Sequence, residues 1–293
     1  MAPHPLTMHH LQTRKIVLGS LAIGGDAPPL IVAGPDSLES ADLVLEIARE
    51  LKAIGGRLSL PVVFKGSYDK ANRSSHRSYR GPGIEKGLLL LERVRGELGL
   101  PITSDVHTIE EAERAGRVLD IVQIPAFLSR QNDLLAAAGR TGKIVNIKKG
   151  QFLPPWSMPQ RVEAAAAPGS PGAVVTERGT TFGHGDLVND FRGMVQIRSA
   201  GIPVIYDASH SVQRPAGLGD RSGGHREWIP FLARGAAGVG CDGFFFEVHP
   251  RPDEALCDGP NALHLALLEP LLAEVAAIDR IARALPTSPV SRP

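Results

Sequence analysis

The residues of this chain that are best suited to chemistry stand where short apolar runs end. Lys65 ends the run VVFK, Lys148 ends IVNIK, and His210 follows VIYDAS. The other polar residues in equivalent places are Asp36, Asp105, His107, Gln123, Glu177, Arg178, Asp207 and Glu247. Any one of them, taken alone, would more often be a solvated loop residue. Their recurrence after every run indicates instead that they share one site.

One group of these residues is positively charged. Its members are Lys65, Lys70, Lys148 and Arg178, with Arg73 and Arg130 in the loops that follow two of the runs. Several cations that converge in one place destabilise a fold unless an anion lies between them. Arginine binds a phosphate or carboxylate through two parallel hydrogen bonds, and lysine binds it as a point charge. We therefore predict a site for an anionic, phosphorylated substrate.

A second group combines one imidazole with three carboxylates. Its members are Asp36, His210, Glu247 and Asp258. Nitrogen and oxygen ligands of this kind suit a divalent metal ion. Each residue, taken alone, would more often form an ion pair or orient a neighbouring group. The mixture therefore indicates a candidate metal site, and the alternative roles stay open.

The apolar runs also predict the fold. They span residues 30–34, 60–67, 100–107, 120–125, 143–149, 172–179, 202–210 and 243–250. Runs of about four to six apolar residues without alternation are typical of strands that are buried on both faces. Amphipathic stretches such as 40–54 and 85–98 lie between them and predict helices. This alternation, without a break in composition, predicts one (β/α)8 barrel of about 250 residues, whose catalytic groups lie at the carboxyl ends of the strands.

The ends of the chain are expected to add little to the barrel. Residues 14–25 predict a short β-hairpin that plugs the bottom of the barrel, and residues 262–285 predict the last helix. We place the single catalytic domain at residues 14–285. Residues 1–13 and 286–293 are expected to be disordered tails.

The bulk composition excludes several classes of protein. The 293 residues carry a net charge of +1, so no strong field attracts nucleic acid or an anionic membrane surface. No run reaches the roughly 18 apolar residues of a membrane span. The two cysteines, Cys241 and Cys257, cannot form a disulfide framework. We expect a cytoplasmic protein with small-molecule substrates and with neither nucleic-acid nor membrane partners.

A set of longer motifs points to one family. The stretch KANRSS (70–75) occurs with SYRGPG, SDVH, IPAFLSRQNDLL, NIKKGQF, TERGTTFG, DASHSVQ and CDGP. With these motifs the chain resembles the 3-deoxy-D-manno-octulosonate 8-phosphate synthase family from about residue 31 to about residue 285. The resemblance implies a transferase that condenses phosphoenolpyruvate with D-arabinose 5-phosphate and water, releases phosphate, and uses no organic cofactor. That reaction belongs to lipopolysaccharide biosynthesis.

The resemblance also implies a role for individual residues. Phosphoenolpyruvate would be held by Lys65, Lys70, Gln123, Lys148 and Arg178. The aldose phosphate would be held by Asn72, Arg73 and Ser74. The catalytic set would comprise Lys70, Asn72, Asp105, His107 and His210, with Asp105 and His107 positioning water or substrate hydroxyls. Phe127 and Arg130 would bind substrate near a subunit boundary, because a homotetramer is usual in the family.

The candidate metal site departs from both patterns of this family. Metal-dependent members carry Cys after Ala-Gly-Pro and metal-independent members carry Asn, whereas AGPDSLES places Asp36 there. Asp36 would add a third carboxylate beside Glu247 and Asp258, and the three repel one another unless a cation or a proton intervenes. Without a thiolate, hard or borderline ions gain over zinc. We therefore expect Mn²⁺ at Asp36, His210, Glu247 and Asp258, with Mg²⁺, Fe²⁺ or Zn²⁺ as alternatives. The competing hypothesis is a metal-free enzyme in which Asp36 is protonated or tolerated.

Three other functions remain as alternatives. The first is a synthase of the 3-deoxy-D-arabino-heptulosonate 7-phosphate type that uses erythrose 4-phosphate, although such enzymes carry a proline-containing stretch in place of KANRSS. The second is an aldolase with Lys148 as a Schiff base, against which the crowding by Lys149 and Arg178 argues. The third is a non-catalytic barrel that binds a sugar phosphate, which would not need the candidate metal residues.

Overall fold

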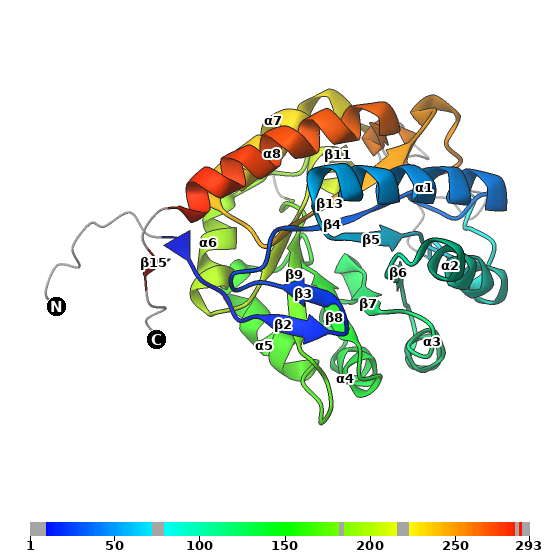
Figure 1. Cartoon of the computed structure of the whole chain (residues 1–293). Helices are drawn as coiled ribbons and strands as arrows, with labels where there is room; N and C mark the ends of the chain where they lie inside the picture. Colours follow the sequence, from blue (N-terminus) through cyan, green and yellow to red (C-terminus); the bar gives the residue numbers. More distant parts are fainter. Residues whose placement is uncertain (1–9, 72–78, 182–184, 216–222, 285–286, 289–293) are drawn as a thin grey trace, which may run out of the picture.

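A closed barrel of parallel strands forms the centre of the computed structural model, which describes residues 10–71, 79–181, 185–215, 223–284 and 287–288 (Figure 1). The barrel strands are β4 (Leu30–Gly34), β5 (Val62–Lys65), β6 (Ile102–Asp105), β7 (Ile121–Ile124), β8 (Ile144–Lys148), β9 (Ala173–Glu177), β10 (Val204–Asp207) and β13 (Gly243–His249). Each strand pairs in parallel with the next, and β13 pairs with both β10 and β4, which closes the barrel. All eight strands were predicted from the apolar runs.

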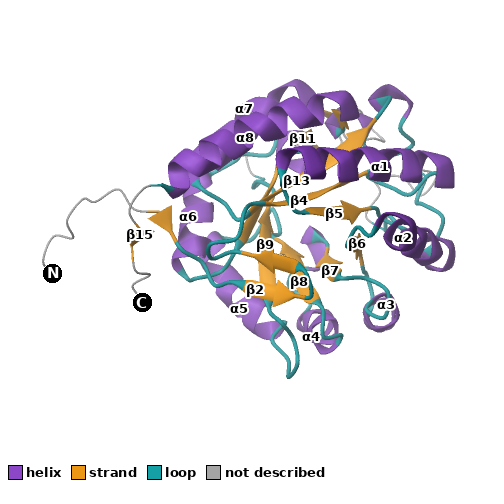
Figure 2. Cartoon of the chain, in the orientation of Figure 1, coloured by secondary structure: helices purple, strands orange, loops and turns teal. Residues whose placement is uncertain are grey.

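Helices surround this barrel as an outer ring, as Figure 2 shows. They are α1 (Ala41–Leu58), α2 (Ile84–Leu98), α3 (Ile109–Ala115), α4 (Asn132–Arg140), α5 (Met158–Ala164), α6 (Phe191–Ser199), α7 (Ile229–Val239) and α8 (Leu268–Arg283). Helix α1 begins at Ser40, whose side chain accepts a hydrogen bond from the backbone N–H of Leu43, and it ends at Ser59 in the left-handed conformation. The predicted (β/α)8 barrel is therefore confirmed. None of the described helices combines the length and the apolar character needed to cross a lipid bilayer.

The lower half of the barrel interior is apolar and is closed by the N-terminal hairpin. Strands β2 (Ile16–Leu18) and β3 (Leu21–Ile23) pair antiparallel. Their buried side chains pack against inward-facing residues of the barrel, which include Leu30, Val32, Val63, Ile121, Ile144, Val174, Ile205 and Phe245. The prediction of a hairpin that plugs the bottom of the barrel is confirmed.

The C-terminal region differs in detail from its prediction. Residues 262–267 do not belong to the last helix: Leu263–His264 form β14, which pairs with β13, and Leu265–Leu267 form a 3-10 turn before α8 begins. The prediction rested on apolar spacing alone, which does not distinguish a short buried strand from the first turn of a helix. The short strands β11 (Gln213–Arg214) and β12 (Gly223–Gly224) pair antiparallel after β10.

Two short segments from opposite ends of the described chain pair with each other. Strand β1 (His10–Leu11) pairs in parallel with β15 (Thr287–Ser288). The guanidinium group of Arg198 is buried and donates a hydrogen bond of 2.7 Å to the carbonyl oxygen of Leu11. The Thr13 hydroxyl donates to Asp242, which also forms a buried ion pair with Arg198 at 3.2 Å. Residues 10–13 therefore contact the barrel, although we assigned them to a tail.

Candidate active site

Polar side chains fill the upper half of the barrel interior, above the apolar layer. Because side chains two positions apart on a strand share a face, residues that follow the apolar layer by two positions also point inward. These residues are Lys65, Gln123, Asn146, Thr176, Asp207 and Glu247, and Asp105 and Lys148 also lie at the carboxyl ends of their strands. All of them are buried. The carboxyl end of the barrel, where we predicted the catalytic groups, is therefore rich in buried ionisable groups.

The four candidate metal ligands come together at this end of the barrel. One ligand atom from each of Asp36, His210, Glu247 and Asp258 lies within 4.8 Å of the others. The first three side chains are buried and Asp258 is half-buried. Asp258 adopts the left-handed backbone conformation, with φ of 43°. Its carboxylate accepts a hydrogen bond from Gln213 at 3.1 Å.

The orientation of His210 also suits a ligand. Its Nδ1 lies 2.8 Å from Asp207 Oδ2, and its backbone N–H donates to Asp207 Oδ1. A carboxylate at one ring nitrogen fixes the imidazole and leaves the other nitrogen for a metal. That other nitrogen, Nε2, is 3.6 Å from Glu247 Oε1.

Some carboxylate oxygens of the cluster are buried without a hydrogen-bond donor. Among the described residues, none donates a hydrogen bond to Oδ2 of Asp36 or to Oε2 of Glu247. A buried acceptor without a donor is costly unless a cation meets it. The donor set and these two oxygens therefore fit a divalent ion, so the buried group could hold a metal.

Two lysines lie among the carboxylates, so the two groups that we separated by charge are interleaved. Lys65 Nζ is 2.9 Å from Glu247 Oε1 and donates to the backbone carbonyl oxygen of Asp36. Lys70 contacts Asp36 and lies 3.8 Å from Glu247. Burial disfavours the charged form of Lys70, but the two carboxylates outweigh burial and hold its pKa well above the ordinary lysine value. The lysines thus offset part of the repulsion that we attributed to the carboxylates.

The other two lysine and arginine residues that we predicted to bind phosphoenolpyruvate, Lys148 and Arg178, are also buried. Lys148 Nζ is 2.8 Å from Asp207 Oδ2 and 4.0 Å from the centre of the Phe245 ring. Burial lowers the pKa of Lys148 below its ordinary value. Arg178 donates to Gln213 Oε1 at 2.6 Å, and its buried Nε has no hydrogen-bond partner among the described residues. This N–H is therefore available to an anion.

Asp105 interacts electrostatically with the buried lysines and with His107. Asp105 accepts hydrogen bonds from Gln123 and Ser67, each at 2.7 Å. Burial alone would raise the pKa of Asp105, but Lys65, Lys70 and Lys148 hold it well below its usual range. His107 Nδ1 is 3.0 Å from Glu111 Oε2, which also accepts from the His107 backbone N–H.

Not every predicted site residue joins this cluster. Phe127 and Arg130 lie between β7 and α4 with exposed side chains, as a subunit contact would require. Asn72, Arg73 and Ser74 lie outside the described residues. Glu177 ends β9 but faces away from the barrel axis, because Val174 and Thr176 take the inward positions.

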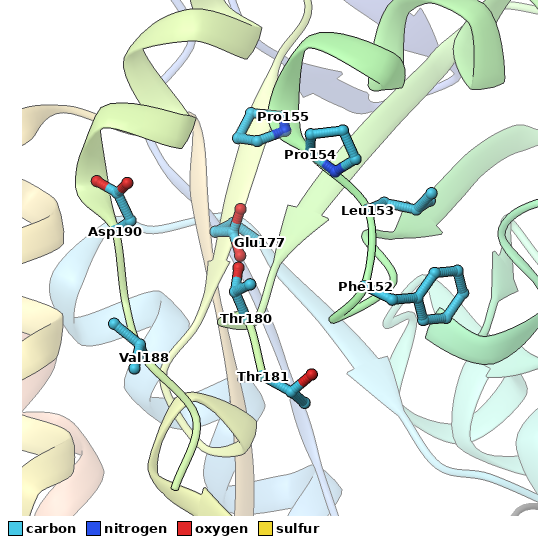
Figure 3. A pocket seen from close by; sticks show the side chains of 9 residues that line it. All are labelled: Phe152, Leu153, Pro154, Pro155, Glu177, Thr180, Thr181, Val188 and Asp190. Atoms are coloured by element: carbon cyan, nitrogen blue, oxygen red, sulfur yellow. The ribbon is translucent and has the colours of Figure 1, made fainter. Parts of the chain in front are cut away.

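Glu177 instead lines a separate open pocket of about 420 Å³. In Figure 3, Pro154 and Pro155 lie on one side of Glu177, and Val188 and Asp190 lie on the other. The remaining lining residues are Phe152, Leu153, Thr180 and Thr181. Glu177 forms a buried ion pair with Lys149 at 3.4 Å, so its charge is already matched.

Two buried residues of the site, Asn146 and Thr176, were not predicted from the sequence. Their spacing could have identified them, because each lies inside an apolar run, an even number of residues from an inward-facing position.

Comparison with known proteins gives one consistent result. Residues 8–282 match the family described as the DAHP synthetase I family. A protein of Geotalea daltonii is 49% identical over 270 residues, which cover 92% of this chain and 99% of the relative. A protein of Desulfosudis oleivorans is 52% identical over 271 residues, which cover 92% of this chain and 97% of the relative. Both relatives are named 2-dehydro-3-deoxyphosphooctonate aldolase.

Proposed function

The chain belongs to the DAHP synthetase I family, and from this membership and its site we infer that it is a 3-deoxy-8-phosphooctulonate synthase. It condenses phosphoenolpyruvate with D-arabinose 5-phosphate and water to give 3-deoxy-D-manno-octulosonate 8-phosphate and phosphate. The observation that carries this conclusion is the identity of about half of all residues with relatives that are named for this product. The buried cations at the barrel mouth support it, because both substrates are anions.

We assign phosphoenolpyruvate to three buried cations at the carboxyl end of the barrel. Lys65, Lys148 and Arg178 are buried, and they would offset the repulsion between two anions held side by side. Gln123 would add an amide contact. Asn72, Arg73 and Ser74 would hold the aldose phosphate. Holding both substrates in reactive geometry is worth up to about 7–11 kcal/mol in favourable cases.

The reaction forms one carbon–carbon bond and one bond between carbon 2 and a water oxygen, and it breaks the bond between carbon 2 and the phosphate oxygen. Carbon 3 of the enol attacks the aldehyde carbon, and Lys70 stabilises the alkoxide that forms. The raised pKa of Lys70 supports a role as a charged donor rather than a base. Carbon 2 becomes cationic and takes up a water molecule, which Asp105 and His107 would position. The resulting hemiketal phosphate then collapses and releases phosphate.

A metal ion is the second part of the proposal. Asp36, His210, Glu247 and Asp258 would hold it, and the oxygens of Asp36 and Glu247 that lack a donor support this assignment. Because the set contains no thiolate, Mn²⁺ is preferred over Zn²⁺, with Mg²⁺ and Fe²⁺ as alternatives. A bound divalent ion would act as a Lewis acid toward a substrate oxygen. Lys65 and Lys70 already offset part of the carboxylate charge. A metal-free enzyme is therefore a stronger alternative than the sequence alone indicated.

The substrate is tested by phosphate release. The purified protein should release phosphate only when both phosphoenolpyruvate and arabinose 5-phosphate are present. The same assay with erythrose 4-phosphate should be much slower. Comparable or faster turnover of erythrose 4-phosphate would contradict the substrate assignment. Failure of borohydride to trap Lys148 with substrate would dispose of the Schiff-base alternative.

The metal is tested by prolonged chelation followed by metal analysis. We expect activity and bound metal to be lost together, and Mn²⁺ to restore both. Full activity in protein verified to be free of metal would end the metal hypothesis. In that case Asp36→Asn should change little, whereas under the metal hypothesis it should lower the stoichiometry of bound Mn²⁺.

We also propose a homotetramer in the cytoplasm. The exposed Phe127, with 54% of its surface accessible, supports a subunit contact at the loop between β7 and α4. Phosphorylated substrates do not cross membranes unaided, so an enzyme that uses them is expected in the compartment where they are made, which we propose is the cytoplasm.

A further inference from the structure

A continuous chain of hydrogen bonds crosses the barrel interior directly above the apolar layer. It runs from the residues after β5 through four successive strands. Ser67 donates to Asp105 at 2.7 Å, and Gln123 Nε2 donates to Asp105 at 2.7 Å. Asn146 Nδ2 donates to Gln123 Oε1 at 2.9 Å, and Thr176 Oγ1 donates to Asn146 Oδ1 at 2.7 Å. We call these five residues the polar chain.

The polar chain has one direction, which Asp105 sets. An ionised carboxylate can only accept hydrogen bonds, so Gln123 must turn its amide nitrogen toward Asp105. Gln123 then presents its oxygen to β8, and only the amide nitrogen of Asn146 can meet that oxygen. The oxygen of Asn146 is left facing β9, where the hydroxyl of Thr176 must donate. Lys65, Lys70 and Lys148 keep Asp105 ionised, because they hold its pKa well below the usual range.

Packing alone does not explain why the residues at these positions are polar. The layer below is formed by branched apolar residues such as Ile121, Ile144 and Val174, as is usual inside such barrels. One step higher on the same strands stand Gln123, Asn146 and Thr176, each at most 1% exposed. Apolar residues would fill this layer without the risk of unmatched polar groups. Polar residues there are useful if they orient Asp105 and Gln123, the two residues of the polar chain to which we assign contacts with water and substrate.

We propose that Ser67, Asn146 and Thr176 are positioning residues, which act by holding Asp105 and Gln123 in a single orientation toward the substrates. This inference rests on the proposed synthase function. Asn146 and Thr176 are buried and reach Asp105 only through Gln123. The polar chain should therefore affect turnover more than the capture of anions, which depends on the cations.

The test is the pair Thr176→Val and Thr176→Ser. Valine has the shape of threonine but lacks the donor, so the buried Oδ1 of Asn146 loses its hydrogen bond and Asn146 holds Gln123 less firmly. We expect kcat to fall roughly ten- to a hundredfold. The KM for phosphoenolpyruvate should stay within about threefold of the wild-type value. Thr176→Ser restores the hydroxyl and should restore most of kcat.

Thr103→Val is the matched control. Thr103 is also a buried threonine on an adjacent part of the barrel, but its hydroxyl donates to the backbone carbonyl oxygen of Ile121 at 2.8 Å. It does not belong to the polar chain, so its loss should leave kcat near the wild-type value. Asn146→Leu and Ser67→Ala interrupt the polar chain at two other points and should also lower kcat. The inference therefore does not depend on the folding of one variant.

The outcomes separate this inference from the proposed function. An active wild type together with a Thr176→Val variant of unchanged kcat would refute the polar chain alone. The polar chain is also refuted if Thr103→Val lowers kcat as much as Thr176→Val does. In that case the loss of any buried hydroxyl would be enough to lower kcat. A wild type that releases no phosphate from its two substrates would refute the synthase function and, with it, this inference.

Discussion

Asp207→Asn is the substitution for which the structure gives the sharpest expectation. The Asp207 carboxylate is fully buried and lies between Lys148 Nζ and His210 Nδ1, at 2.8 Å from each. Burial alone would raise the pKa of Asp207, but His210 and Lys148 hold it well below its usual range. Asparagine keeps the shape but removes the charge. Lys148 is then left buried without its carboxylate.

The size of the effect follows from distance and burial. At 2.8 Å and an effective dielectric constant near 20, the attraction between the two charges is about 6 kcal/mol. Desolvation offsets part of this, and removing one partner of a buried pair costs about 3–5 kcal/mol. We expect about 3 kcal/mol, because the amide can still accept from Lys148. That loss corresponds to a fall in Tm of roughly 6–12 °C.

Urea denaturation at fixed protein concentration measures this loss. The matched control is Asp26→Asn, because Asp26 and Lys15 are also 2.8 Å apart but both side chains are exposed. An exposed pair at the same distance contributes little, so the control should leave the unfolding midpoint unchanged within error. Equal effects of the two substitutions would refute the claim that burial decides the size. So would a loss below about 1 kcal/mol for Asp207→Asn.

Three further predictions follow from the same site. Arg73→Ala should mainly raise the KM for the aldose phosphate and Arg178→Ala the KM for phosphoenolpyruvate; interchangeable kinetic effects would show that our division of the cations is wrong. Burial lowers the pKa of His107, but Glu111, Asp105 and Asp69 raise it more, so that it lies above the ordinary value. Protonated His107 stabilises the fold below the ordinary imidazole pKa, and this stabilisation is lost as the pH rises through the raised pKa of His107. Glu111→Gln should therefore lower Tm more at about pH 6 than at about pH 9. An effect that grew with pH would contradict this assignment of charge. Light scattering should give the mass of a homotetramer, and a fully active monomer would argue against a site completed across subunits.

The barrel could be predicted because its strands are buried on both faces. Runs such as LIVAG, which became Leu30–Gly34, contain no alternation and leave few other structures open. The closure of the barrel then brings the carboxyl ends of the strands together, so residues as distant as Asp36 and Asp258 could be placed in one cluster before any geometry was known. The family motifs made that placement specific.

The pairing of charges could not be predicted. Sequence position shows that Lys65 and Glu247 both end strands, but not that their side chains meet at 2.9 Å. Grouping residues by sign was therefore misleading for Lys65 and Lys70, because opposite charges attract across the barrel. Asn146 and Thr176 were missed for a different reason. Each lies inside a strand, where we looked for apolar residues, and only the parity of its position marks it as inward-facing.

The plugged bottom of the barrel has a consequence for the order in which the protein folds. Thr13 and Asp242, which join the N-terminal segment to the barrel, are 229 residues apart in the chain. Strand β4 likewise completes its pairing with β13, near the other end of the barrel. On a ribosome the N-terminal hairpin is made long before its partners Ile205 and Phe245. Contacts of such long range form slowly, so until translation is nearly complete the apolar residues Ile16, Leu21 and Ile23 have no finished surface to cover.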